Sequence, residues 1–177
     1  DWSSDVCSSD LDSSSNNFTI TRNGNTTQGT FTPFSQTGWG VFFSESTSDY
    51  ITTPNSTNFA FGTGDYTVEF WMNTADTAAG FAQVTGGTTG YWQVGLSGSQ
   101  IVWQNSRDTN NLILQNIATY LNNQWHHVAF CRSGTTLRLF IDGVQITSAT
   151  DSTNYTGTGG SLLSRKSTRL NSSHGYI

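Results

Sequence analysis

The acidic residues of the chain are the side chains that could cleave a sugar linkage. Glycoside hydrolysis needs two carboxyl groups roughly 5–5.5 Å apart for retention and about 6.5–9.5 Å apart for inversion. The glutamates are Glu45 and Glu69, far apart in sequence, and the nearest acidic neighbour of Glu69 is Asp65. Four residues along an extended strand span about 13 Å, too far for either mechanism. We therefore expect no enzyme activity and no catalytic residues, and keep a degenerate glycoside hydrolase only as a remote alternative.

The adjacent His126 and His127 could bind a metal or transfer a proton. Neighbouring side chains on a strand point to opposite faces, so both rings cannot bind one ion. We expect one ring at the rim of the core and the other in solvent. Calcium needs six to eight oxygen ligands, and five aspartates, at positions 49, 65, 108, 142 and 151, do not cluster in the sequence. No cofactor and no metal ligand is predicted, although a calcium site built from separate loops stays open.

Two strands carry an aromatic ring beside amide or carboxylate groups, which is the chemistry of a sugar-binding surface. The first candidate set is Glu69 and Trp71, with Asn73 on the same strand face, and the second is Tyr91 with Gln93. A tryptophan exposed on a polar face would indicate a binding surface. The alternative is that Trp71 packs against an opposite sheet or a covering loop, because large aromatic side chains are mostly buried.

The composition favours strands and excludes some partners. Charged residues make up 11% of the chain, the net charge is −5 and the pI is about 4.8. Phosphate binding needs a basic patch, so nucleic acid is not an expected partner. No apolar run is long enough to span a bilayer, so no membrane insertion is expected. Abundant Thr, Ser and Asn disfavour helices.

Alternating apolar and polar residues predict an antiparallel sandwich. Val68, Phe70 and Met72 recur with a period of two, which is the strand pattern. Asp142-Gly143 suits a type I′ hairpin, in which both central residues need positive φ. Residues 112–121 fit either a helix or a strand followed by a loop, and we favour the strand. The other expected strands are 18–21, 39–43, 49–52, 81–84, 91–96, 100–104, 125–132, 136–141 and 144–148.

The two ends of the chain are predicted to be foreign to the domain. Residues 1–10 can be encoded by DNA that resembles a stock sequencing-library adapter, and the reverse complement of that DNA encodes Arg165 to Ser173. We therefore assign 1–11 and 165–177 to translated adapter, which the nucleotide record would test. Removing Cys7 leaves Cys131 as the single cysteine, so no intrachain disulfide is expected.

Two stretches resemble the concanavalin A-like lectin/glucanase superfamily, and within it the laminin-G and pentraxin-like jelly rolls. These are Phe59–Trp71 and Trp125–Gly143, the latter combining a strand, a glycine turn, a second strand and an Asp-Gly turn. The resemblance implies an all-β antiparallel jelly-roll sandwich over 36–164, preceded by a linker or first strand at 12–35. Family members continue past this point, so we expect the domain to be truncated at its C-terminus, with low stability in isolation.

The same resemblance implies a non-catalytic binding or adhesion module in a larger extracellular or virion protein. Its expected partners are glycans or proteins of a cell surface or virion. The alternative is a structural spacer of a phage tail or surface array that binds no small ligand. Both functions rest on fold analogy at this point.

Overall fold

The computed structural model describes residues 14–29, 40–43, 49–85, 91–105, 111–156, 160–166 and 172–175. These residues form two seven-stranded antiparallel sheets and two short 3-10 helices, η2 (Thr57–Phe59) and η3 (Ala118–Tyr120). The segment 1–11 lies outside the described residues, whereas 165–177 contributes the end of one strand and all of another. The assignment of both ends to adapter concerns the coding DNA and stays a prediction.

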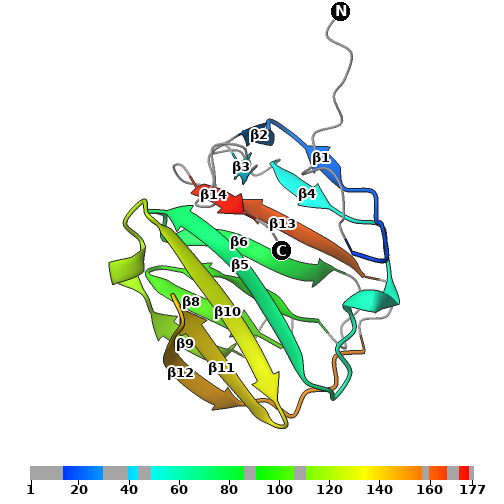
Figure 1. The fold of residues 1–177 in the computed structure, drawn as a ribbon, viewed down its shortest axis with the longest axis vertical. Coiled ribbons are helices and arrows are strands. Elements are labelled where there is room, and N and C mark those ends of the chain that lie inside the picture. Colours follow the sequence, from blue (N-terminus) through cyan, green and yellow to red (C-terminus); the bar gives the residue numbers. More distant parts are fainter. Residues whose placement is uncertain are drawn as a thin grey trace, which may run out of the picture.

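The sheets stack face to face and confirm the predicted all-β jelly-roll sandwich (Figure 1). In spatial order the first sheet contains β1 (Thr21–Asn23), β4 (Tyr50–Thr52), β13 (Ser161–Lys166), β6 (Ala78–Thr85), β7 (Gln93–Ser97), β8 (Gln100–Gln104) and β9 (Asn111–Asn116). The second contains β12 (Val144–Thr150), β11 (Thr136–Ile141), β10 (Trp125–Ser133), β5 (Tyr66–Thr74), β14 (Ser172–Gly175), β3 (Gly40–Phe43) and β2 (Thr27–Gly29).

Strand β5 shows how the sequence pattern selects the inner face. Val68, Phe70 and Met72 are at most 5% exposed and join the core, while Glu69 is exposed. Because successive side chains of a strand point to opposite faces, residues 67, 69, 71 and 73 form the outer face. The predicted alternation is confirmed.

Strands β10, β11 and β12 form the predicted meander. Phe130 pairs with Leu139 between β10 and β11, and Ile141 pairs with Val144 across the second turn. Asp142 and Gly143 have φ of 51° and 79° in that turn, as a type I′ hairpin requires. The Asp-Gly prediction is therefore confirmed.

Some predicted strand boundaries were wrong. The strand expected at 18–21 instead spans Thr21–Asn23, and the ring of Phe18 packs on Phe59, 5.5 Å between centroids. Tyr91 precedes β7, which begins at Gln93. The ambiguous stretch 112–121 is a strand, β9, followed by a loop that contains η3. Trp39, included in the third predicted strand, lies outside the described residues.

The core between the sheets is centred on aromatic rings. Trp103 is fully buried and its ring lies 5.6 Å from that of Trp92, 5.4 Å from that of Tyr66 and 5.1 Å from that of Phe130. Such offset contacts add to the free energy gained by burying the ring surfaces. Trp103 belongs to one sheet and Tyr66 and Phe130 to the other, so these rings connect the two layers.

Strands β6 and β7 pack closely together at one glycine. A side chain at Gly95 would place its Cβ only 2.6 Å from the carbonyl oxygen of Ala79, so β6 and β7 can approach this closely only with glycine there.

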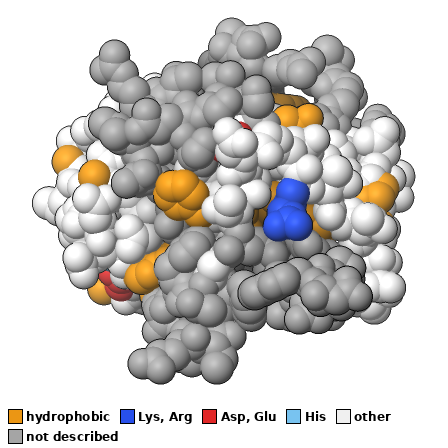
Figure 2. All heavy atoms as spheres, turned by 90° about the horizontal axis from the view of Figure 1, so that it is seen from above, with side chains coloured by type: hydrophobic (Ala, Val, Ile, Leu, Met, Phe, Trp, Pro, Cys, Tyr) orange, Lys and Arg blue, Asp and Glu red, His pale blue; other side chains and the backbone are white. Residues whose placement is uncertain are grey.

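Seen from the end that carries β1 and β4, the described hydrophobic side chains form small separate groups among uncharged polar ones (Figure 2).

Candidate functional site

The outer face of β5 and β10 brings three polar and aromatic side chains together. Trp71 is paired across the strands with His127, and their ring centroids are 5.2 Å apart. The carboxylate of Glu69 lies diagonally from His127, with 3.4 Å between Glu69 Oε2 and His127 Nε2. Glu69 and His127 keep 62% and 29% of their side-chain surface exposed. We call Glu69, Trp71 and His127 the outer-face cluster.

The position of Trp71 excludes packing against the opposite sheet, which was one of the expectations for this residue. Its neighbours Phe70 and Met72 point into the core, so the Trp71 side chain points away from the opposite sheet. Trp71 is half-buried and its ring contacts His127 on the adjacent strand. Half-buried Trp125 and Asn73, a cross-strand pair, continue the same face. The outer face of this sheet therefore presents aromatic surface beside hydrogen-bonding groups.

The second predicted pair lies at the other sheet, where Gln93 begins β7 and Tyr91 stands two residues before it. Tyr91 is only 5% exposed and its hydroxyl donates a hydrogen bond to Gln93 Oε1. A longer contact of 3.5 Å joins the same hydroxyl to Gln83 Oε1. The structure therefore brings Glu69 and Trp71 together, adds His127 to them, and places Tyr91 and Gln93 in a separate polar group with little exposed aromatic surface.

His126 points to the other side of β10 from His127 and connects two loops. Its Nδ1 lies 2.7 Å from Asp142 Oδ2 and its Nε2 lies 3.1 Å from Asn122 Oδ1. Asp142 also accepts a hydrogen bond from the backbone N–H of His127, at 2.9 Å. Asp142, identified from the sequence as a turn residue, therefore also fixes the start of β10. His126 is a structural residue in this arrangement.

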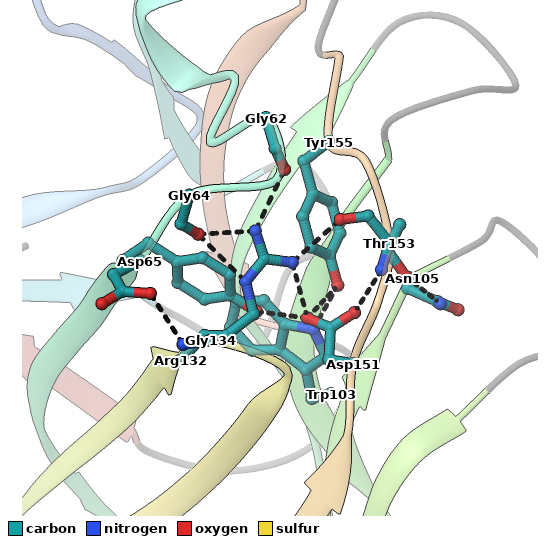
Figure 3. A network of polar contacts seen from close by, with 11 residues as sticks. Gly62, Gly64, Asp65, Trp103, Asn105, Arg132, Gly134, Asp151, Thr153 and Tyr155 are labelled. Carbon is teal, nitrogen blue, oxygen red and sulfur yellow. Dashed lines mark hydrogen bonds and ion pairs between the residues drawn. The ribbon is translucent and has the colours of Figure 1, made fainter.

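A buried ionic network closes one end of the core, and the sequence did not reveal it (Figure 3). The guanidinium of Arg132 lies 3.2 Å from Asp151 Oδ2, and the two side chains are 1% and 0% exposed. The remaining N–H groups of Arg132 donate to the carbonyl oxygens of Gly62, Gly64 and Thr153 at 2.6–3.0 Å. Because the charges are enclosed and hydrogen-bonded, the network has a structural role and offers no surface to a ligand.

Two tyrosines complete the network by donating to the same carboxylate. The hydroxyls of Tyr66 and Tyr155 lie 2.9 and 3.1 Å from Asp151 Oδ2. The guanidinium of Arg132 also lies over both rings, 4.6 and 5.3 Å from their centroids. Burial, together with the charge of Asp151, raises the pKa of Tyr66 well above its usual value, and burial raises the pKa of Tyr155 to about 12.

These shifts predict a loss of stability at alkaline pH. Free tyrosine ionises near pH 10, so below about pH 10 both the folded and the unfolded chain keep these protons. Between about pH 10 and 12 only the folded state holds them, so the free energy of unfolding should fall by up to about 1.4 kcal/mol per pH unit for each tyrosine. Urea unfolding measured from about pH 9 to about pH 11.5 would show this slope.

A matched pair of variants distinguishes the contribution of the network tyrosines to this alkaline slope from that of other groups that titrate at alkaline pH. Tyr155→Phe should reduce the alkaline slope, because one shifted proton is removed. Tyr120→Phe replaces a half-buried tyrosine that packs on His126 outside the network, and should leave the slope unchanged. Equal slopes for Tyr155→Phe and the parent protein would contradict the assignment.

The described part of the chain contains no other cluster that suggests a metal or a covalent chemistry. Its His, Cys, Asp and Glu side chains form no group of three or more that could hold a metal ion. Cys131, half-buried on β10, is its free cysteine. No helix within the described ranges is long and apolar enough to cross a membrane.

Comparison with known families identifies the fold. The family model described as the concanavalin A-like lectin/glucanases superfamily, of the laminin-G type, matches residues 45–176. The chain belongs to this superfamily. The match covers both stretches on which the sequence resemblance rests, from Phe59 to Trp71 and from Trp125 to Gly143, and confirms the resemblance. No curated protein sequence matches the chain.

Several solved structures with the same fold are of toxins or their binding domains. The binding domain of Paraclostridial Mosquitocidal Protein 1 superposes with a TM-score of 0.72 and 15% identity, covering 93% of this chain and 44% of that one. A botulinum neurotoxin type C structure superposes with a TM-score of 0.67 and 12% identity. The binding domain of botulinum neurotoxin DC superposes with a TM-score of 0.66 and 14% identity. For both, the match covers 93% of this chain and 42% of the other. The chain thus spans less than half of each structure, and at these identities the likeness shows the fold alone.

Proposed function

We propose that this superfamily member is a non-catalytic binding module of an extracellular protein, and that it binds glycans through the outer-face cluster. The observation that carries the proposal is the Trp71 ring on the outer side of β5, with the Glu69 carboxylate and the His127 imidazole beside it. An aromatic face can pack against the apolar C–H face of a sugar ring. A carboxylate accepts hydrogen bonds from sugar hydroxyls, and an imidazole can donate or accept them.

The sheet supplies the rigidity that such a site requires. Trp71 and His127 belong to the central strands β5 and β10, which pair continuously from Tyr66 to Asn73. Side chains on the inner faces of both strands are packed in the core, so the backbone beneath the cluster is fixed. A binding site on such strands loses less conformational entropy on binding than one on a loop.

The related folds support a glycan as the ligand class. The type C structure is titled as showing that cell entry of that toxin depends on interaction with two ganglioside molecules, and the DC binding domain is described in complex with SialylT. Those ligands belong to the toxins. For this chain they support the choice of glycans over other ligands and an extracellular location for the whole protein.

Truncation of Trp71 tests the proposal. We expect Trp71→Ala to reduce affinity for any glycan that the parent chain binds on a glycan array by roughly tenfold or more, as loss of a central aromatic contact does. Leu114→Ala is the matched control, because Leu114 is a large hydrophobic side chain on β9 of the other sheet, 48% exposed. It should leave binding unchanged.

The outcomes of this test are separable. Far-UV circular dichroism and a thermal melt establish that each variant keeps the fold. Undiminished binding by a folded Trp71→Ala variant would move the site elsewhere. A parent chain that binds no glycan on the array would exclude the glycan proposal and favour a spacer without a small ligand.

A further inference from the structure

The outer-face cluster carries a negative charge, and within the described strands β5 and β10 no lysine or arginine lies on the same outer face. Glu69 is 62% exposed, and the group next to its carboxylate is the imidazole of His127 at 3.4 Å. In β5, β10, β11 and β12 the lysines and arginines are Arg132 and Arg138. Arg132 is buried on the inner face, where Asp151 and backbone carbonyls already take up its donors.

Arg138 lies on the same outer face as Glu69 but well away from the Trp71 ring. It pairs with Cys131, which in turn pairs with Thr67, so Arg138 stands level with Thr67 and two strands away from β5. Thr67 is four residues from Trp71, about 13 Å along the strand, and two strand spacings add roughly 10 Å across the sheet. Among the described side chains of β5, β10, β11 and β12, the permanent charge nearest the Trp71 ring is therefore the Glu69 carboxylate.

We propose that the outer-face cluster selects neutral sugars and discriminates against sugars that carry a carboxylate or sulfate, such as terminal sialic acid. This inference rests on the proposed function and adds its ligand class. A neutral sugar offers hydroxyl donors to the Glu69 carboxylate while its apolar face covers the Trp71 ring. An acidic sugar in the same place brings a second negative charge close to Glu69, and no lysine or arginine on the described outer face of β5 and β10 offsets the repulsion.

The size of the effect follows from the exposure of Glu69. Two like charges about 6–8 Å apart in a water-like medium repel enough to weaken binding roughly threefold. Because the interaction runs through solvent, it is screened by salt and should largely disappear at about 1 M ionic strength. A discrimination of steric origin would not depend on salt.

The experiment compares the affinities of the chain for pairs of glycans that differ only in a terminal sialic acid, for example lactose and 3′-sialyllactose. An array identifies the pairs that bind, and titration then measures the affinity of each member. The parent chain should prefer the neutral member of each pair roughly threefold at low salt. Glu69→Gln, which keeps the size and removes the charge, should bring the two members close to equal affinity. Ser97→Lys is the control, because it raises the net charge by the same one unit from an exposed position on β7 of the other sheet, and it should keep the preference.

The possible results separate the two proposals. Equal or tighter binding of sialylated members by the parent chain overturns the inference and leaves the glycan-binding function standing. A preference that Glu69→Gln does not reduce, or that about 1 M salt does not weaken, also overturns it, because the selection would then not arise from this charge. No binding to any member of any pair overturns both.

Discussion

Replacing Arg132 with methionine is expected to lower the free energy of unfolding by about 3–5 kcal/mol. The change leaves Asp151 at 0% exposure without the cation that faces it at 3.2 Å. It also removes donors from the carbonyl oxygens of Gly62, Gly64 and Thr153. Removing one partner of a buried ion pair is costly because the remaining charge stays desolvated.

Further variants test whether the unpaired, desolvated charge of Asp151 causes the loss of stability. Arg132→Lys keeps the charge but lacks the planar fork, so it should recover only part of the loss. Adding Asp151→Asn to Arg132→Met removes the stranded charge and should be less destabilising than the sum of the two single changes. Arg138→Met, at a half-buried arginine on β11, is the control and should change stability by about 0.5 kcal/mol or less.

Urea unfolding of these variants and of the single Asp151→Asn variant, followed by circular dichroism, measures these differences. Domains of this kind have about 5–15 kcal/mol of stability in total, so Arg132→Met should shift the midpoint strongly or leave the chain unfolded. In the second case the ranking of Arg132→Lys and of the double variant still tests the argument. An Arg132→Met variant as stable as Arg138→Met would show that the network contributes nothing.

The sheet strands could be predicted because their signal is local. In β5 the alternation of Val68, Phe70 and Met72 fixes the inner face without knowledge of any partner strand. The Asp142-Gly143 turn is likewise encoded in two adjacent residues. The alternation was weaker in residues 18–21. There Phe18 packs on Phe59, and the strand begins only at Thr21.

The candidate site could be predicted in part, because two of its three residues share one strand. Alternation placed Glu69 and Trp71 together on the outer face of β5. The position of His127 opposite Trp71 depends on the register between β5 and β10, which residues far apart in the chain determine together. For the same reason the sequence could not show that Tyr91 and Gln93 belong to the other sheet.

The Arg132 network had a local signal that the sequence analysis did not use. Val128, Phe130 and Arg132 recur with a period of two, so Arg132 belongs to the inner face of an otherwise apolar strand. A buried arginine needs an anionic partner. That partner, Asp151, was among the five aspartates judged to be scattered, because its approach to Arg132 depends on the path of the chain after β12.

Truncating Trp103 to alanine is the second change expected to have a large effect, with a loss of about 3–5 kcal/mol. Trp103 is fully buried, and its ring contacts Tyr66 and Phe130 of the opposite sheet as well as Trp92. Its Nε1 also donates to the hydroxyl of Tyr155 at 3.0 Å, so the variant leaves a cavity and takes a donor from the Asp151 network. Both losses act on the contact between the layers.

Comparing variants of Trp103 and Trp71 shows whether the loss of stability depends on burial of the side chain or on its being a tryptophan. Trp103→Phe keeps a ring but loses the N–H donor, so its loss should be smaller than that of Trp103→Ala. Trp71→Ala removes the same number of atoms from the outer face, outside the core, and should cost about 1 kcal/mol or less. Guanidinium unfolding followed by far-UV circular dichroism suits the series, because the variants differ in tryptophan fluorescence. If Trp71→Ala proved as damaging as Trp103→Ala, Trp71 would be part of the fold's support, and its exposure on β5 could no longer be attributed to ligand binding.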